Sequence, residues 1–146
     1  MRWLAAATIA LLGLGGAASA ASNCYEEDVP KAYDAIYRVG TWRELSSFYQ
    51  RYGACDQEAI STGVSDRVAD LLANSWNTVE DLKRFAENKD FAEFVLYHVD
   101  SLMRAEEAKA ILDNVRNHCP TDATELCGRI EHEIVDALPK IPGAGD

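Results

Sequence analysis

The residues best suited to chemistry in this chain are its four cysteines and three histidines, which are Cys24, Cys55, His98, His118, Cys119, Cys127 and His132. Thiolate and imidazole groups bind metals, act as nucleophiles and take part in redox exchange. The stretch HCPTDATELC, residues 118–127, places two cysteines eight positions apart with a histidine beside the first. These side chains could form a metal site, a redox centre or a disulfide.

Helical geometry argues against the metal site and the redox centre. Five residues at about 100° each lead from Cys127 to His132, which places the two side chains about 140° apart around a helix. The segment HEIVD, residues 132–136, has Asp136 where a zinc protease has its second histidine. The cysteines also lack C-x-x-C spacing. We therefore assign no metal ligand and no cofactor, and we expect His132 to face solvent.

The first twenty residues have the pattern of a secretory signal peptide. Arg2 lies beside the amino terminus, a short apolar run follows, and the small residues Ala18, Ser19 and Ala20 are typical of a cleavage site. The apolar run is too short and too rich in glycine for a membrane-spanning helix. We expect cleavage after Ala20 and export to the periplasm or the cell exterior, without membrane insertion.

An even number of cysteines in an exported chain is typical of disulfides, and four cysteines allow three pairings. Cys24 precedes the first expected helix and Cys55 follows the second, so an antiparallel hairpin brings them to the same end. Cys119 ends one helix, and Cys127 lies on the apolar side of the next. We predict the pairs Cys24–Cys55 and Cys119–Cys127, each contributing about 2–4 kcal/mol to stability.

No residue is assigned a catalytic role. His98 is in helical phase with Phe94 and Leu102, so a hydrogen-bonded core histidine is favoured over a general base. Asp100 is only two residues further on, and neighbours at that spacing point to different sides of a helix. The chain contains no glycine-rich phosphate loop, nucleophile elbow or EF-hand loop. A small hydrolase that uses His98 or His132 with carboxylates stays open as an alternative.

Aromatic residues are crowded into residues 25–52. They are Tyr25, Tyr33, Tyr37, Trp42, Phe48, Tyr49 and Tyr52. Tyrosine and arginine are enriched at protein-binding hot spots, and arginines are interleaved with these aromatic residues. The candidate partner-binding residues are Tyr33, Tyr37, Arg38, Tyr49, Arg51 and Tyr52. The alternative is that these tyrosines form the edge of a helical core.

Apolar residues recur at helical spacing nearly everywhere, and no segment alternates like a half-buried strand. Thr41 with Glu44 predicts a capping box at the start of the second helix. Gly63 is expected to bend or break the third helix, and the buried side of the fifth extends to Leu102. The other expected helix starts are Pro30, Asp56, Thr78, Asp90 and Asp122, and the expected helix ends are Gly40, Gly53 and Pro139.

These patterns predict an all-α fold. Residues 21–138 are expected to form a single small domain of six or seven short helices, arranged in antiparallel hairpins and cross-linked by two disulfides. The length that remains after signal cleavage is typical of one domain. Residues 139–146 have little to bury, so we expect them to form a flexible tail.

The charge of the chain restricts its partners. Against 24 acidic residues it has 14 lysines and arginines, a net charge of −10 at pH 7. Nucleic acid and anionic membranes are therefore poor partners, whereas a protein with a basic surface would be attracted. The function we expect is a protein-binding module, such as an inhibitor or immunity-type protein that occludes a basic effector or envelope enzyme. A structural or assembly factor of the envelope, with homo-oligomers, is a further alternative.

Overall fold

The computed structural model describes residues 23–144 and confirms the all-α fold, with no strand in that range. The expected signal peptide, residues 1–20, lies outside the described residues. The helices are α1 (Val29–Ile36), α2 (Trp42–Tyr52), α3 (Glu58–Asn74), α4 (Val79–Phe85), α5 (Lys89–Tyr97), α6 (Ala105–Asn117) and α7 (Thr124–Ala137). None of them is long and apolar enough to cross a membrane.

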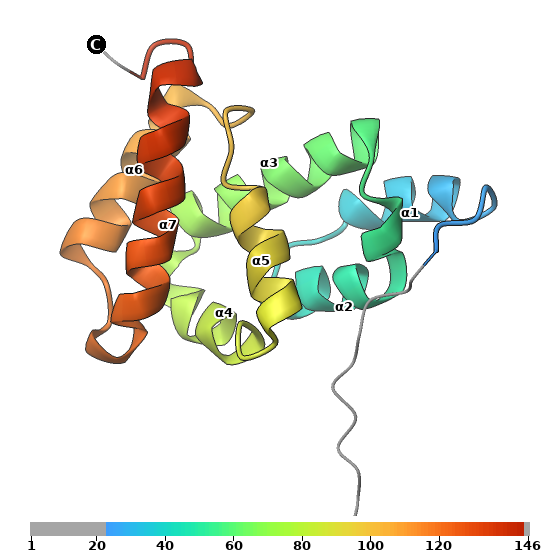
Figure 1. The fold of residues 1–146 in the computed structure, drawn as a ribbon, viewed down its shortest axis with the longest axis horizontal. Coiled ribbons are helices and arrows are strands. Elements are labelled where there is room, and N and C mark those ends of the chain that lie inside the picture. The colour runs from blue at the N-terminus through green and yellow to red at the C-terminus, as the bar shows by residue number, and fades with distance from the viewer. Residues whose placement is uncertain (1–22, 145–146) are drawn as a thin grey trace, which may run out of the picture.

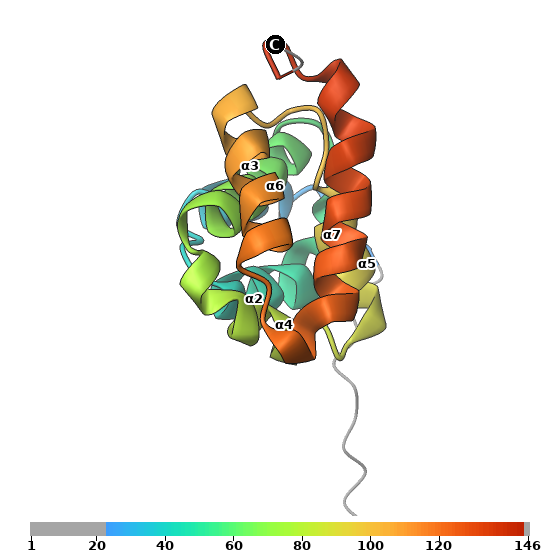
Figure 2. The ribbon, with the colours of Figure 1, turned by 90° about the vertical axis from the view of Figure 1, so that its left-hand side faces the viewer.

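Two helix hairpins form the two ends of the molecule, and α3 connects them (Figure 1). The α1–α2 hairpin packs at one end of α3, and the α6–α7 hairpin packs at the other. Helices α6 and α7 run side by side in both views (Figures 1 and 2), and α5 lies between α2 and α7. The surface of α1 is therefore remote from the α6–α7 hairpin.

The start of α2 is the capping box that the sequence predicts. The Thr41 hydroxyl accepts a hydrogen bond from the Glu44 backbone N–H at 3.2 Å, and the Glu44 carboxylate accepts one from the Gly40 backbone N–H at 2.9 Å. The Thr41 hydroxyl in turn donates a hydrogen bond to the Glu44 carboxylate at 3.1 Å. The bonds that the carboxylate accepts, the one from Gly40 foremost and then the one from the Thr41 hydroxyl, lower the pKa of Glu44. The box satisfies backbone donors that the first helical turn leaves unpaired.

Three other expected caps are wrong. Asn88, not Asp90, caps α5, because its side chain accepts from the backbone N–H groups of Asp90 and Phe91. The Asp56 side chain does not cap α3 and instead contacts His98. Asp122 does not cap α7 either, and its carboxylate pairs with Lys83. In the last two cases the aspartate expected to cap the helix binds a residue distant in sequence instead.

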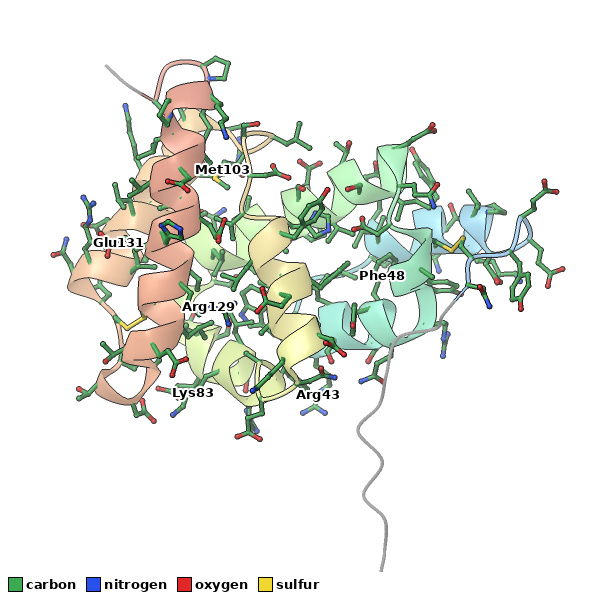
Figure 3. The ribbon with its side chains drawn as sticks, in the orientation of Figure 1. Arg43, Phe48, Lys83, Met103, Arg129 and Glu131 are labelled. Carbon is green, nitrogen blue, oxygen red and sulfur yellow. A yellow bond between two sulfur atoms is a disulfide. The ribbon has the colours of Figure 1, made fainter. Side chains whose placement is uncertain are left out.

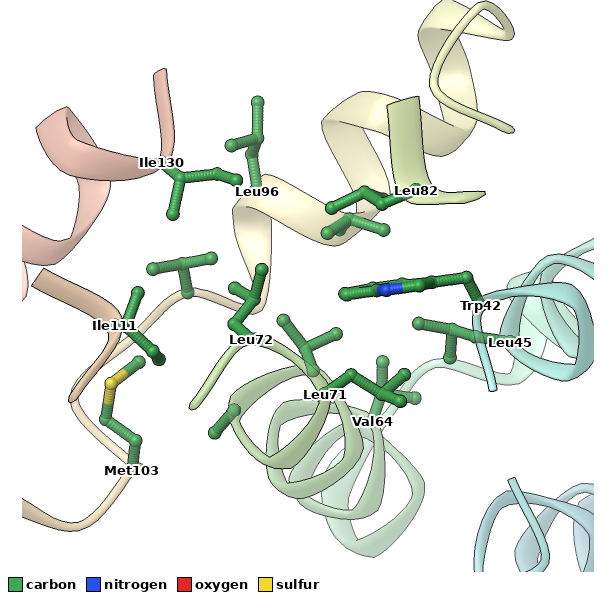
Figure 4. Close-up of a cluster of buried hydrophobic side chains, with 14 of the residues drawn as sticks. Trp42, Leu45, Val64, Leu71, Leu72, Leu82, Leu96, Met103, Ile111 and Ile130 are labelled. Atoms are coloured by element: carbon green, nitrogen blue, oxygen red, sulfur yellow. The ribbon is translucent and has the colours of Figure 1, made fainter. Parts of the chain in front are cut away.

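One continuous core runs between the two ends of the molecule. Trp42 packs beside α3 and α4, where Figure 4 shows it among Leu45, Val64 and Leu82. These four side chains are at most 2% exposed. Burying a large apolar side chain contributes about 1.5–3 kcal/mol, so this cluster holds the α1–α2 hairpin against α3 and α4.

The structure differs from the sequence expectation after α5 and near the carboxyl terminus. Helix α5 ends at Tyr97, so Leu102 lies beyond it and is 55% exposed instead of buried. The Asp100 carboxylate accepts a hydrogen bond from the Leu102 backbone N–H at 2.8 Å, a local turn that competes with helix continuation. Near the carboxyl terminus Ile141 is 3% exposed within the core, so the expectation that residues 139–146 bury little is wrong there.

Both predicted disulfides are present, and Figure 3 shows them at opposite ends of the molecule. Cys24–Cys55 joins the segment before α1 to the turn after α2, with the two Cα atoms 4.9 Å apart. Cys119–Cys127 joins the end of α6 to the first turn of α7, with a Cα separation of 6.2 Å. The stretch that suggested a metal site is thus the covalently closed corner between the last two helices.

Candidate interaction surface and buried polar chain

Tyr33 of α1 and Tyr37, which caps the carboxyl end of this helix, form an exposed aromatic pair. The two side chains lie one helical turn apart, and their residues are 44% and 48% exposed. Their rings meet edge to face with centroids 5.0 Å apart. This arrangement suits the quadrupoles of two aromatic rings, so each ring fixes the orientation of the other.

The ring of Tyr37 also lies against α3. A Cβ atom built on Gly63 would come within 3.7 Å of the Tyr37 Cζ atom. A hydrogen bond with Tyr33 is the main cause that raises the pKa of Tyr37, followed by desolvation and by the charges of Tyr33 and Asp66. The hydroxyl of Tyr37 therefore keeps its proton in the hydrogen bond with Tyr33, and its oxygen can still accept a hydrogen bond from a partner.

Helix α1 is held firmly although it is only eight residues long. Ala32 and Ile36 are fully buried on its inner side. Ile36 approaches α3 so closely that a Cβ on Gly63 would be 3.0 Å from its Cγ2 atom. The Cys24–Cys55 disulfide tethers the segment that leads into the helix. The tyrosine pair is therefore presented on a preorganised support.

Three of the predicted partner-binding residues line a shallow hollow between α1 and α2. Arg38, Arg51 and Tyr52 contribute to its wall, and Val39 and Phe48 contribute apolar surface. The Arg51 guanidinium lies 5.9 Å from the centroid of the Tyr52 ring, within cation–π range. The tyrosine pair is on the α3 side of α1, so the predicted residues form two patches flanking this helix instead of one.

Tyr49 belongs to neither patch. It is 9% exposed, and its ring packs against Phe91 and Phe94 with centroid distances of 5.6 and 4.9 Å. Desolvation by this packing raises the pKa of its hydroxyl. Tyr49 is thus a core residue, and we leave it out of the candidate surface.

A chain of four polar side chains lies inside the molecule. His98 is fully buried, with Nδ1 2.9 Å from the Ser65 hydroxyl and Nε2 2.9 Å from Asp56 Oδ2. The Ser65 hydroxyl is also 2.8 Å from Asp100 Oδ2. We call these four residues the His98 chain. It confirms that His98 is a hydrogen-bonded core residue and joins three segments: the turn before α3, α3 itself and the turn after α5.

The His98 chain contains a serine, a histidine and two aspartates, but it does not form an accessible catalytic site. Ser65 is 2% exposed and His98 is fully buried, so a substrate cannot reach either side chain. A nucleophilic serine must be open to the bond that it attacks. The structure does bring His98 together with two carboxylates, Asp56 and Asp100, but it encloses the ring and the serine between them.

The other two histidines lie at the surface. The side chain of His132 is 71% exposed, and its Nε2 atom is 3.8 Å from Asp136. The side chain of His118 is 61% exposed and lies 3.5 Å from Asp113. In residues 23–144, no three histidine, cysteine, aspartate or glutamate side chains converge as metal ligands would.

Sequence reasoning did not find the partners of His98. Ser65 and Asp56 lie 33 and 42 residues before it in the chain. Asp100 belongs to the His98 chain only because α5 ends before His98. In a continued helix the side chains of His98 and Asp100 would point to different sides. The apolar helical pattern around His98 implied that the ring is buried and has a hydrogen-bond partner. Nothing in the sequence identified which residues those partners are.

Comparison of the chain with protein-family models, with curated proteins and with solved structures finds no match in any of the three. A function must therefore be inferred from the aromatic surface, the charge and the buried polar chain of this protein alone.

Proposed function

We propose that the protein is an exported, acidic protein-binding module whose contact surface is centred on Tyr33 and Tyr37. The observation that carries this proposal is the exposure of the two rings, 44% and 48%, in a fixed edge-to-face geometry on α1. Tyrosines that only completed the core would be covered, as Tyr49 is. Two adjacent half-exposed rings are the kind of surface that a partner covers.

The support of the tyrosine pair favours tight binding. Partners that order loops or side chains on association lose about 0.5–1.5 kcal/mol for each immobilised flexible side chain. The tyrosines have few rotatable bonds, and Gly63 together with the Cys24–Cys55 disulfide already holds α1 in place. Little further ordering is needed when a partner docks, so more of the contact energy contributes to affinity.

The charge of the protein favours a partner with a basic surface. The net charge is −10, and Asp34 on α1 and Asp66 on α3 are exposed near the tyrosine pair. An acidic field accelerates encounter with a basic partner, and lysine or arginine side chains can stack on tyrosine rings. The concrete version of the proposal is an inhibitor or immunity-type protein that occludes a basic effector or envelope enzyme.

The test is affinity capture from an envelope extract with the oxidised chain from residue 21 onward. The double variant Tyr33→Ala, Tyr37→Ala is compared with wild type and with Tyr97→Ala. The last variant is a matched control, because Tyr97 is 72% exposed but lies on α5. We expect a basic protein to be retained by wild type and by the control, and less at high salt.

The double variant is expected to lose at least tenfold in affinity for that protein, measured by titration calorimetry. Retention of the same partners by all three proteins would contradict the proposed surface. Retention of another copy of the same chain alone, with a dimer lost in the double variant, would indicate an assembly factor instead of an inhibitor.

A further inference from the structure

The hydrogen bonds of the His98 chain require a specific number of protons. Three contacts join the four groups: Asp56 to His98, His98 to Ser65, and Ser65 to Asp100. Each hydrogen bond needs one proton. The serine hydroxyl supplies one and a neutral imidazole supplies one, whereas ionised carboxylates supply none. Two ionised aspartates and a neutral ring would therefore leave one of the three contacts without a proton.

The third proton belongs on the ring. Asp100 accepts hydrogen bonds at both oxygens, from Ser65 and from the Leu102 backbone N–H, so neither of these contacts needs a proton from the carboxyl group. The Oδ1 atom of Asp56 is buried without a hydrogen-bond partner. A carboxylate in such a place needs a nearby positive charge, and a neutral ring would not provide one. Imidazole also binds a proton more tightly than a carboxylate does in water.

We infer that His98 is a buried imidazolium, which donates Nε2–H to Asp56 and Nδ1–H to Ser65 while Ser65 donates to Asp100. The ionisable groups that meet the ring are Asp56, from the turn before α3, and Tyr97 of α5, whose ring is nearly perpendicular to the imidazole with centroids 5.2 Å apart. Asp100 faces the ring through Ser65 of α3. The bound proton thus connects three segments that are distant in sequence: the turn before α3, α3 itself and the turn after α5.

The proton makes this connection sensitive to pH. Asp56 directly follows Cys55, so the His98 chain also fixes the turn at which the Cys24–Cys55 disulfide is attached. When His98 loses one of its two ring protons, one of the three contacts has no proton, and two lone pairs face each other there. The turn at Asp56 then loses a charge-assisted hydrogen bond. Protonation of His98 therefore stabilises the contact between the three segments, and a rise in pH weakens it.

The sign of the stability effect follows from proton counts. In an unfolded chain a histidine is mostly neutral above about pH 7. The folded protein then holds one proton more than the unfolded chain, and stability falls as pH rises until the folded ring is also neutral. At most, one extra proton changes the unfolding equilibrium constant by about tenfold per pH unit.

Two isosteric variants test the inference, because each replaces the missing proton with an amide N–H. In Asp100→Asn the amide donates to Ser65, Ser65 donates to Nδ1, and a neutral ring keeps its proton on Nε2. In Asp56→Asn the amide donates to Nε2, and a neutral ring keeps its proton on Nδ1. All three hydrogen bonds remain in both variants, but the extra proton is no longer needed.

The measurement is nitrogen-15 NMR of the imidazole rings at pH 7.5 in the full exported chain. We expect both ring nitrogens of His98 protonated in wild type, only Nε2 in Asp100→Asn and only Nδ1 in Asp56→Asn. A neutral ring in wild type would overturn the inference, as would an unchanged imidazolium in either variant.

A second measurement serves if one variant folds poorly. The unfolding equilibrium of wild type and of the better-folded variant is followed in urea between pH 7 and 9. Wild type should lose stability with rising pH, and the variant should lose less over the same range. Parallel pH profiles for the two proteins would overturn the inference.

Discussion

Gly63 of α3 lies directly against Ile36 of α1, so that a Cβ atom on the glycine would be 3.0 Å from Ile36 Cγ2. The sequence suggested that Gly63 bends or breaks α3, but the helix continues through it from Glu58 to Asn74. The glycine instead allows the two helices to approach closely. It therefore controls where α1, and the tyrosines that it carries, can sit.

We expect Gly63→Ala to destabilise the protein by about 1–3 kcal/mol, because the added methyl group forces Ile36 or α1 to shift. Gly128 in the helix α7 provides a matched control, since a Cβ there meets nothing within 4 Å. Gly128→Ala should stabilise by about 0.5–1 kcal/mol through helix propensity. Urea unfolding measures both, and equal effects at the two glycines would contradict the packing argument.

Removing the two disulfides should have unequal effects. Cys24–Cys55 encloses a sequence separation of 31 residues, and Cys119–Cys127 one of 8. In the chain-entropy model these loops correspond to about 3.7 and about 2.5 kcal/mol. Unfolding of the two paired cysteine-to-serine variants in urea should reproduce that order. A larger loss at the shorter loop would show that native contacts, not loop closure, dominate.

The titration of the Tyr37 hydroxyl should depend on its contact with Tyr33. The hydrogen bond with Tyr33 is the first cause that raises the pKa of Tyr37. Tyr33→Phe should therefore lower the pKa of Tyr37 toward its ordinary value, as followed by carbon-13 NMR of the tyrosine Cζ atoms. Tyr97→Phe serves as the control and should leave the Tyr37 titration unchanged.

The capping box of α2 should contribute to stability in a pH-dependent way. Thr41→Ala removes a cap and should cost about 0.5–2 kcal/mol at neutral pH. The folded-state pKa of Glu44 is lowered, so its contribution is present above its ordinary pKa and is lost as pH falls through the folded value.

Thr41→Ala should raise the pKa of Glu44 only in part, because the Gly40 bond remains. Carbon-13 titration of the Glu44 carboxylate measures this shift. An unchanged titration would mean that the Thr41 hydroxyl does not stabilise the ionised carboxylate.

The fold was predictable because most of its determinants are local. The capping box at Thr41, the proline at the start of α1 and the Cys119–Cys127 disulfide each follow from residues near one another in the chain. The pairing of Cys24 with Cys55 needed only one assumption, an antiparallel hairpin. Expectations of this kind depend on helical periodicity, which the sequence displays plainly.

The features that were missed involve competition between local and distant partners. Asp56 looks like a helix cap, but His98 offers it a charge-assisted hydrogen bond inside the protein. Leu102 continues the apolar pattern of α5, but Asp100 turns the chain with a bond to the Leu102 backbone. Such choices depend on which residues meet after folding, and a single sequence does not display them.

The candidate surface was predictable only in part for the same reason. Tyr33, Tyr37 and Tyr49 are residues of one type with similar local surroundings, and their exposure differs because Phe91 and Phe94 arrive from α5 to cover Tyr49. The sequence located the tyrosine-rich hairpin. It could not say which rings the rest of the chain would cover.

The Cys24–Cys55 disulfide makes α1, α2 and every tyrosine and arginine of the candidate surface part of one covalent ring. A protease that cuts this ring once leaves both pieces attached, and the buried Ala32, Ile36 and Trp42 still hold them on the core. Two cuts are needed before a fragment can leave. A single cut inside the ring therefore does not separate any part of the candidate surface from the protein.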